Sequence, residues 1–388
     1  MWSVPKDGPR RAYMMRGFCL RTPILRRTCD RRNPLPGCGA CTLPVTVSEK
    51  GAGIMARLVE KMTGERQARM ALSMIAEPND PAIGRVLNQV GGIETLRMIE
   101  DDQATVPGMN RADAIAWRER MQAGIAPGLA RRVAQLQGGS IGTLIPSDAH
   151  WPVSMNGLGD RTPYLFWTRG STSFLGGAVE DRVAISGARA ASPYGTTVAA
   201  ELAGELANQE RVIVADGSYG IEGAAHQAAL AAGGSTVAVL ASGLDRPYPA
   251  GHAEMLDRIG DLGLLVSEVP PGEVPTRYRF MARIRLLAAL SGTTVIPEAG
   301  PRSMSLLVPT EARDLGRAVG AVPGPVTSAA SAGTNGLIKR GVADVVTNAQ
   351  EVTALLDKPE GPGRHRPDIG HQLDTPAPAT SAPSGPHL

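Results

Sequence analysis

Residues 212–240 read VIVADGSYGIEGAAHQAALAAGGSTVAVL, and the fold class follows from this run of residues. It opens on a short apolar run, Val212–Ala215, and passes through a glycine-containing loop into a helical pattern over Glu222–Ala232. A second apolar run, Thr236–Leu240, follows directly after a pair of glycines. A strand, a helix and a second strand of these lengths predict two parallel strands joined by a crossover helix.

The same alternation extends from residue 182 to residue 356. Further strands are predicted at Val183–Ile185, Leu264–Ser267, Thr293–Pro297 and Ala318–Val322. Helices are predicted near Thr197–Asn208, His252–Ile259, Met281–Leu290 and Ser303–Gly316. The sequence therefore predicts an α/β fold with a doubly wound, mainly parallel sheet, whose strand-to-helix loops share one edge where ligands bind.

The chain divides into five segments by composition. Residues 55–137 repeat apolar residues at helical spacing and predict a small all-α module, with turns at Pro107-Gly108 and Pro127-Gly128. Helical hairpins with such turns can grip a nucleic-acid backbone, although most are packing units. We expect residues 138–180, which are rich in aromatics, to pack across the junction with the 181–357 domain. We expect residues 1–54 and 358–388 to be a disordered basic leader and a disordered tail.

The net charge of +3 conceals two unlike regions. Residues 1–41 carry nine Lys or Arg and two Asp, whereas the remaining 347 residues carry 31 basic and 35 acidic side chains. Because the body of the chain is mildly acidic, an anion-binding role must come from a local cluster. No run of about 18 apolar residues and no signal peptide occur, so we expect a cytoplasmic protein without a membrane span.

All four cysteines lie in the basic leader, at positions 19, 29, 38 and 41. The two-residue gap between Cys38 and Cys41 fits a zinc knuckle, but nine residues separate the other two. The leader is therefore interpreted as disordered, with zinc binding as the alternative. The absence of cysteine from the body fits a reducing compartment.

Two loops at the predicted ligand edge combine glycine with groups that suit phosphate or bases. Gly187 lets the backbone turn after a strand, and the planar guanidinium of Arg189 matches phosphate oxygens. Gly217 and Gly220 flank Tyr219, an aromatic that could stack a base. The structural alternatives are a solvated arginine and a simple turn.

A third region is the most suggestive of nucleic acid. Basic residues alternate with aromatics between positions 277 and 285, and a further Arg-Ser pair opens a later helix. Charges that follow a backbone and rings that stack bases are what a single-stranded groove needs, so we favour this interpretation over a solvated helix start. The candidates are Arg277, Arg279, Phe280, Arg283, Arg285, Arg302 and Ser303.

Several enzyme classes lack their motifs here. Neither G-x-G-x-x-G nor G-x-S-x-G follows a predicted strand, and no G-x-x-x-x-G-K-[ST] occurs. The six histidines form no metal-spaced cluster. We therefore expect a protein that is not an enzyme and that holds neither a cofactor nor a metal.

Taken together and in order, the loops resemble the DNA-processing protein A family, also called DprA or Smf. The resemblance runs from about Thr143 to Leu356, and the Tyr219 variant and the GPVTSA stretch are similar to its actinobacterial branch. It rests on the stretches GAR at 187–189, SPYG at 192–195, YGIE at 219–222, TVAVLASGLDRPYP at 236–249, LLVSEVPPG at 264–272 and AVPGPVTS at 321–328.

The resemblance implies an extended Rossmann-like fold that binds single-stranded DNA without catalysis. It implies a homodimer that protects incoming DNA and loads a RecA-type recombinase during natural transformation (competence) and recombination. Carried over by position, the DNA pocket would use Arg189, Arg283 and Arg285, with backbone donors around Gly187, Gly217 and Gly220.

The chain departs from the family pattern at the pocket. Asp216 stands where the family has Gly, Ile284 where it has Asn, and Met304 where it has Gly. Pro309 inside a predicted helix should kink or shorten it. Two alternatives therefore stay open: a nucleotide-derivative sensor or phosphoribohydrolase-like enzyme, with Ser218, Tyr219, Glu222 and Glu298 at the small-ligand edge, and a divergent paralogue that has lost its ligand.

Overall fold

A computed structural model describes residues 57–356 of the 388-residue chain. The basic leader, with its four cysteines, and the 358–388 tail lie outside the described residues. The alternative of zinc binding by these cysteines therefore concerns residues that the structure does not describe. All six predicted strands are present, and three others join them to make one nine-stranded sheet. The strands are β1 Gly142–Leu144, β2 Phe166–Gly170, β3 Arg182–Ile185, β4 Val212–Asp216, β5 Thr236–Leu240, β6 Leu264–Ser267, β7 Thr293–Ile296, β8 Ala318–Ala321 and β9 Asp344–Val345.

The strand order is β1-β2-β6-β5-β4-β3-β7-β8-β9, and the seven strands from β6 to β9 are mutually parallel. The chain builds outward from β3 in one direction through β4 to β6, and then crosses back to place β7 on the other side of β3. The reversal lies between β3 and β7. In open parallel sheets the loops beside such a reversal diverge and leave room for a ligand.

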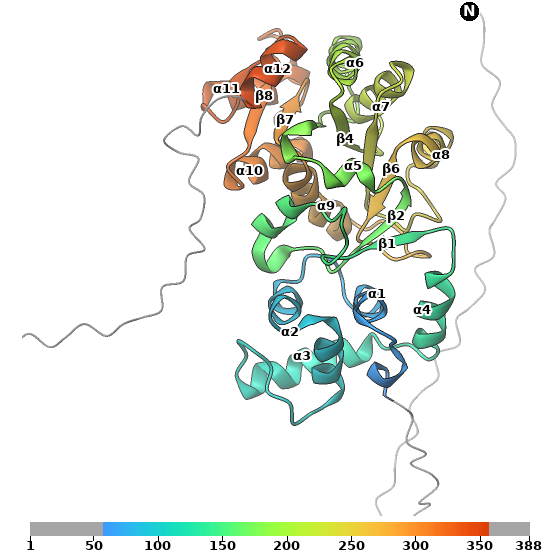
Figure 1. Ribbon diagram of the computed structural model, residues 1–388. Coiled ribbons are helices and arrows are strands. Elements are labelled where there is room, and N and C mark those ends of the chain that lie inside the picture. The colour runs from blue at the N-terminus through green and yellow to red at the C-terminus, as the bar shows by residue number, and fades with distance from the viewer. Residues whose placement is uncertain (1–56, 357–388) are drawn as a thin grey trace, which may run out of the picture. The chain divides into compact units, whose positions relative to one another are not determined.

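Helices cover both faces of this sheet, as a doubly wound fold requires (Figure 1). Helices α6, α7 and α12 share one apolar cluster with β3, β4 and β7, whereas α9 and α10 share another with β4 to β8. Ala, Val, Leu and Ile dominate both clusters, as the low aromatic content predicted. The helix bounds are α6 Pro193–Asn208, α7 Ile221–Ala231, α8 Ala253–Leu262, α9 Arg277–Leu290, α10 Leu307–Asp314, α11 Ala332–Lys339 and α12 Ala349–Leu356.

The helical segment before the sheet packs into an apolar cluster that continues onto β2, β5, β6 and α8. It comprises α1 Glu65–Ile75, α2 Pro81–Glu100, α3 Arg111–Ala123 and α4 Leu129–Gln137. Helix α2 contains a break at Gly91, whose φ is 77°. Glycine tolerates that positive φ, so the chain turns there without ending the helical element.

The aromatic junction does more than pack. Strands β1 and β2 lie within it and extend the sheet antiparallel beyond β6. Phe166 and Trp167 are fully buried on opposite faces of β2, where they belong to the two different apolar clusters. A 3-10 segment, η2 Val153–Arg161, lies between β1 and β2, and a short helix, α5 Ser173–Gly176, follows β2.

Pro309 has the effect expected of it. The predicted helix from Ser303 begins instead with a 3-10 turn, η5 Met304–Leu306, and α10 starts at Leu307. Pro309 thus falls in the first turn of α10, where a missing N–H breaks no intrahelical bond. The shift leaves Ser303 to Ser305 in a turn beside the ligand edge.

Candidate functional site

A cavity of about 220 Å³ opens at the carboxyl end of the parallel strands. Its walls come from the loop after β3, the end of β4, the first turn of α7, one face of α9 and the turn that leads into α10. The apolar part of the lining is made by Phe280, Ile284, Leu287, Met304 and Val308. The lining residues that carry charge or hydrogen-bonding groups are Ser186, Arg189, Asp216, Glu222, Arg283, Ser303 and Ser305.

The loop after β3 is held by buried carboxylates from two other elements. The Gly187 amide donates to Glu222 Oε1 over 3.0 Å, and Ser186 Oγ donates to the same oxygen over 2.9 Å. A Cβ on Gly187 would lie 2.6 Å from the Glu298 carbonyl oxygen, so only glycine fits. The sequence predicted that the Gly187 amide donates to a ligand, but in the structure this amide already donates to Glu222.

Glu298 follows β7 and fixes the start of α6. Its Oε2 accepts from the Ser192 amide over 2.7 Å, and its Oε1 accepts from Ser192 Oγ over 2.7 Å. The residue is buried. Both oxygens are thus occupied within the protein, and Glu298 acts as a positioning residue. This geometry does not favour the alternative in which Glu298 meets a small ligand.

Phe280 brings two guanidinium groups together. The Cζ atoms of Arg189 and Arg283 lie 5.1 and 5.3 Å from the centre of its ring. The ring of Tyr248 meets Phe280 edge-on, with centroids 5.9 Å apart. Phe280 therefore orients cations that come from two distant parts of the chain.

Arg283 forms a buried ion pair with Asp216, at the end of β4. Asp216 Oδ1 also accepts from the Ser218 amide over 2.6 Å, so the carboxylate is fixed at both oxygens. Glu222 lies in the same cavity wall, and its Oε2 has no hydrogen-bond partner in the described part of the chain. Burial, reinforced by the negative charge of Asp216, raises the pKa of Glu222 to about 8. At neutral pH the wall thus holds one carboxylate, one neutral carboxyl and one guanidinium.

The position of each remaining arginine around helix α9 decides whether its side chain lines the cavity. Helix α9 begins at Arg277, four residues earlier than expected, because Thr276 Oγ1 accepts from the Arg279 amide over 3.1 Å. Residues two apart then point in widely different directions. Phe280 and Arg283 line the cavity, whereas Arg279 pairs with Glu77 and Glu273.

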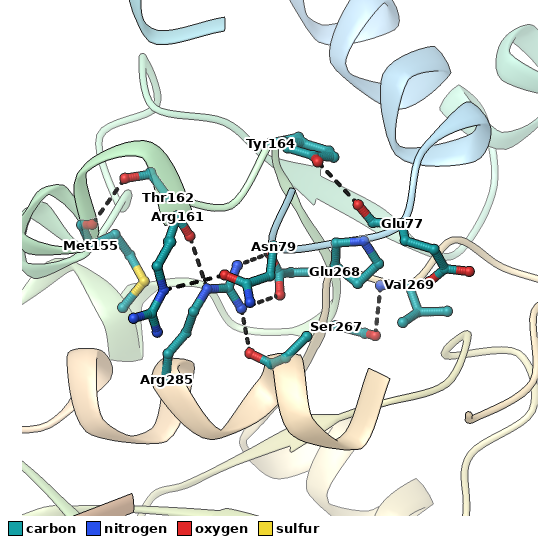
Figure 2. Close-up of polar contacts among 12 residues, drawn as sticks. Glu77, Asn79, Met155, Arg161, Thr162, Tyr164, Ser267, Glu268, Val269 and Arg285 are labelled. Carbon is teal, nitrogen blue, oxygen red and sulfur yellow. Dashed lines mark hydrogen bonds and ion pairs between the residues drawn. The ribbon is translucent and has the colours of Figure 1, made fainter. Parts of the chain in front are cut away.

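Arg285 lies on the opposite side of α9, in a network that Figure 2 shows. Its guanidinium donates to both carboxylate oxygens of Glu268, to the Arg161 carbonyl oxygen over 2.9 Å and to the Ala282 carbonyl oxygen. It is 1% exposed and does not line the cavity. Four of its five N–H groups are engaged within the protein and the side chain is buried, so the geometry argues against the predicted DNA contact and assigns Arg285 to packing.

Three predicted arginines remain free for a ligand. Arg189, Arg277 and Arg302 are exposed, and none of them has an acidic partner within residues 57–356. Ser303 lines the cavity and its Oγ lies 2.7 Å from Ser305 Oγ. The basic character of this edge therefore comes from these three side chains, not from the whole arginine run.

The loop after β4 is organised around His252. The Gly217 carbonyl oxygen lies 3.0 Å from His252 Nδ1, and the Tyr219 ring packs edge-on against His252 with centroids 4.5 Å apart. Tyr219 is half exposed, whereas Gly217 is buried. Gly220 adopts φ 80° and lies directly against the Ala188 and Arg189 carbonyl groups. None of the three lines the cavity, so they shape its approach.

Three contributors were not among the sequence candidates: Thr276, Asp216 as a partner of Arg283, and Tyr248. Glu298 and Asp216 each end or follow a strand at the ligand edge, and that position is a usable signal. Between residues 57 and 356 no group of three metal-ligating side chains gathers, and no helix is long and apolar enough to cross a membrane.

Known proteins show similarity to both the sequence and the fold. The profile of the family described as DNA recombination-mediator protein A matches residues 142–357. A DNA processing protein DprA of Mycobacterium tuberculosis is 40% identical over 295 residues, which is 74% of this chain and 73% of the relative.

Two solved structures have similar folds. The structure of DNA processing protein A from Streptococcus pneumoniae has a TM-score of 0.61 at 28% identity and covers 76% of this chain and 98% of its own. A structure described as giving the single-stranded DNA binding mode of DNA processing protein A from Helicobacter pylori has a TM-score of 0.51 at 30% identity. It covers 56% of this chain and 96% of its own.

Proposed function

The chain belongs to the DNA recombination-mediator protein A family, and from that premise we propose that it binds single-stranded DNA at the carboxyl edge of its sheet. One observation carries the proposal: three exposed arginines, Arg189, Arg277 and Arg302, follow strands at the carboxyl edge of the sheet and have no acidic partner in residues 57–356, and Arg189 lies over the ring of Phe280, in a chain body that is otherwise acidic. Guanidinium groups bind phosphates, and an aromatic ring among them gives a base a surface to stack on.

The finer parts of the proposal follow from the family. The protein acts in the cytoplasm without catalysis, forms a homodimer, and delivers the bound strand to a RecA-type recombinase. The similarity to the Helicobacter pylori protein, whose structure is described by its single-stranded DNA binding mode, supports the ligand. The domain boundaries proposed are the helical module at 55–137, the junction at 138–180 and the Rossmann-like domain at 181–357.

The test is a fluorescence-anisotropy titration of labelled oligo-dT, single- and double-stranded, at a series of salt concentrations. The full chain is compared with a triple variant, Arg189→Ala, Arg277→Ala and Arg302→Ala. Loss of three phosphate contacts should lower the salt slope for single-stranded DNA by about 2. A matched triple variant at exposed arginines outside the cavity, Arg111, Arg131 and Arg258, removes the same charge.

Comparing the two variants distinguishes DNA binding at a specific site from attraction by the overall positive charge. Preference for single strands, and a loss confined to the first variant, would support the proposal. Equal losses in both variants would mean that affinity comes from overall charge, which the basic leader also supplies. The proposal would then be rejected.

A further inference from the structure

We propose that Asp216 is a built-in competitor for the DNA phosphate: it neutralises Arg283 and thereby weakens binding at this edge. The inference rests on the proposed function, since it concerns how the same site is controlled. Asp216 is an anion inside a cavity whose exposed rim carries an unpaired cation, and its partner is the one arginine that lies deep in the cavity wall.

The contacts show that Asp216 engages the cation that a ligand would need. The Arg283 and Asp216 side chains are 7% and 8% exposed, and Arg283 Nη2 donates to Asp216 Oδ2. Phe280 holds the guanidinium from another side, with the Cζ atom 5.3 Å from the ring centre. A phosphate that approaches Arg283 therefore has to displace or share a carboxylate already fixed by the Ser218 amide.

Glu222, the second carboxyl group of the cavity, does not remove the competition between Asp216 and a phosphate for Arg283. Glu222 is buried in the same wall, and its hydrogen bonds to the Ser186 hydroxyl and the Gly187 amide fix it there. A neutral Glu222 adds no negative charge, so Asp216 and Arg283 cancel and the cavity interior carries no net charge. Arg189, whose Cζ atom lies 5.1 Å from the centre of the Phe280 ring, has no carboxylate partner in residues 57–356 and keeps its charge for the ligand.

The experiment is a double-mutant cycle on the full chain with labelled single-stranded oligo-dT. Asp216→Asn keeps the size of the side chain and the acceptor for the Ser218 amide, but removes the charge. At about 0.1 M salt, one regained phosphate contact should tighten binding about fivefold and steepen the salt slope by about 0.7. Arg283→Ala alone leaves Asp216 as an unneutralised anion in the cavity and should weaken binding, and in the Asp216→Asn background it should abolish the gain.

Two controls keep the outcomes distinct. Glu205→Gln removes one exposed carboxylate from α6 and tests whether any loss of negative charge tightens binding. Thermal unfolding of each variant shows whether the fold is retained, and Asp216→Ser offers a second route if the amide is poorly tolerated. Tightening by Glu205→Gln equal to that of Asp216→Asn would overturn the inference.

Failure of the inference and failure of the proposed function give different results. If Arg189→Ala weakens binding while Asp216→Asn and Asp216→Ser leave it unchanged or weaker, the site stands and the competitor role is wrong. If neither the native chain nor the Asp216 variants bind single-stranded DNA, both proposals fall. Binding by the Asp216 variants alone would support the competitor role and would contradict DNA binding by the native chain.

Discussion

Arg285 and Glu268 form a buried bidentate ion pair, with Arg285 Nη2 2.6 Å from Glu268 Oε1 and Arg285 Nη1 2.8 Å from Glu268 Oε2. We expect Arg285→Ala to lower the free energy of unfolding by about 3–5 kcal/mol, because it leaves a carboxylate buried without its partner. Chemical denaturation measures this. Arg277→Ala on the exposed side of the same helix should change stability by less than about 0.5 kcal/mol. An Arg285 variant that loses DNA affinity at native stability would contradict the packing role.

Glu222 should make the protein less stable as the pH rises. Its pKa is raised from 4.5 to about 8 on folding by burial and by Asp216, so the folded state binds more protons between these values. Its favourable contribution is complete below about pH 4.5 and is lost as the pH rises through 8. Glu222→Gln keeps an acceptor for Gly187 and cannot ionise. Its melting temperature, compared with that of the native chain, should improve more at pH 8 than at pH 5, and an equal shift at both would contradict this.

His226 should have the opposite effect and make the protein less stable as the pH falls. It is fully buried, with Nδ1 2.7 Å from Thr236 Oγ1 and Nε2 3.0 Å from the Asp216 carbonyl oxygen, and burial lowers its pKa from 6.5 to about 4. The unfolded state binds more protons in that window, so stability falls as the pH drops from 6.5 to 4. The loss should reach about 3 kcal/mol.

Melting curves between about pH 4 and pH 7 measure the effect of His226. His226→Gln should be less stable at neutral pH, but should lose less on acidification. The opposing effect of Glu222 on the same pH range is removed by measuring the Glu222→Gln variant. If the stability of that variant does not change between about pH 4 and pH 7, His226 is not buried as a neutral ring.

Gly220 should resist substitution. Its backbone has φ 80° and ψ −125°, and a Cβ there would lie 2.2 Å from the Ala188 carbonyl oxygen. Gly220→Ala should destabilise the protein by about 1–3 kcal/mol through strain and weaken DNA binding by shifting the loop that carries Arg189. Gly204 in α6 has open space around the site of a Cβ. Gly204→Ala should therefore stabilise the helix by about 0.5–1 kcal/mol, with DNA binding unchanged.

The α9 arginines show why the candidate site could be predicted only in part. In the sequence they alternate with aromatics, which suggests one continuous basic groove. In the helix, Arg283 faces the cavity and Arg285 faces Glu268, because residues two apart are separated by more than half a turn. Arg279 is engaged by Glu77, which lies 202 residues away in sequence. No local pattern indicates a partner so distant.

Local patterns in the chain were enough to predict the alternation of strands and helices, the ligand edge and the family. Apolar periodicity and glycine placement act over a few residues, so six parallel strands and the effect of Pro309 could be inferred before any tertiary contact was known. Which charges remain free depended on the tertiary structure alone. Ion pairs form between residues that folding brings together: Asp216, Glu268 and Glu77 engage Arg283, Arg285 and Arg279, whereas Arg189, Arg277 and Arg302 have no acidic partner within residues 57–356.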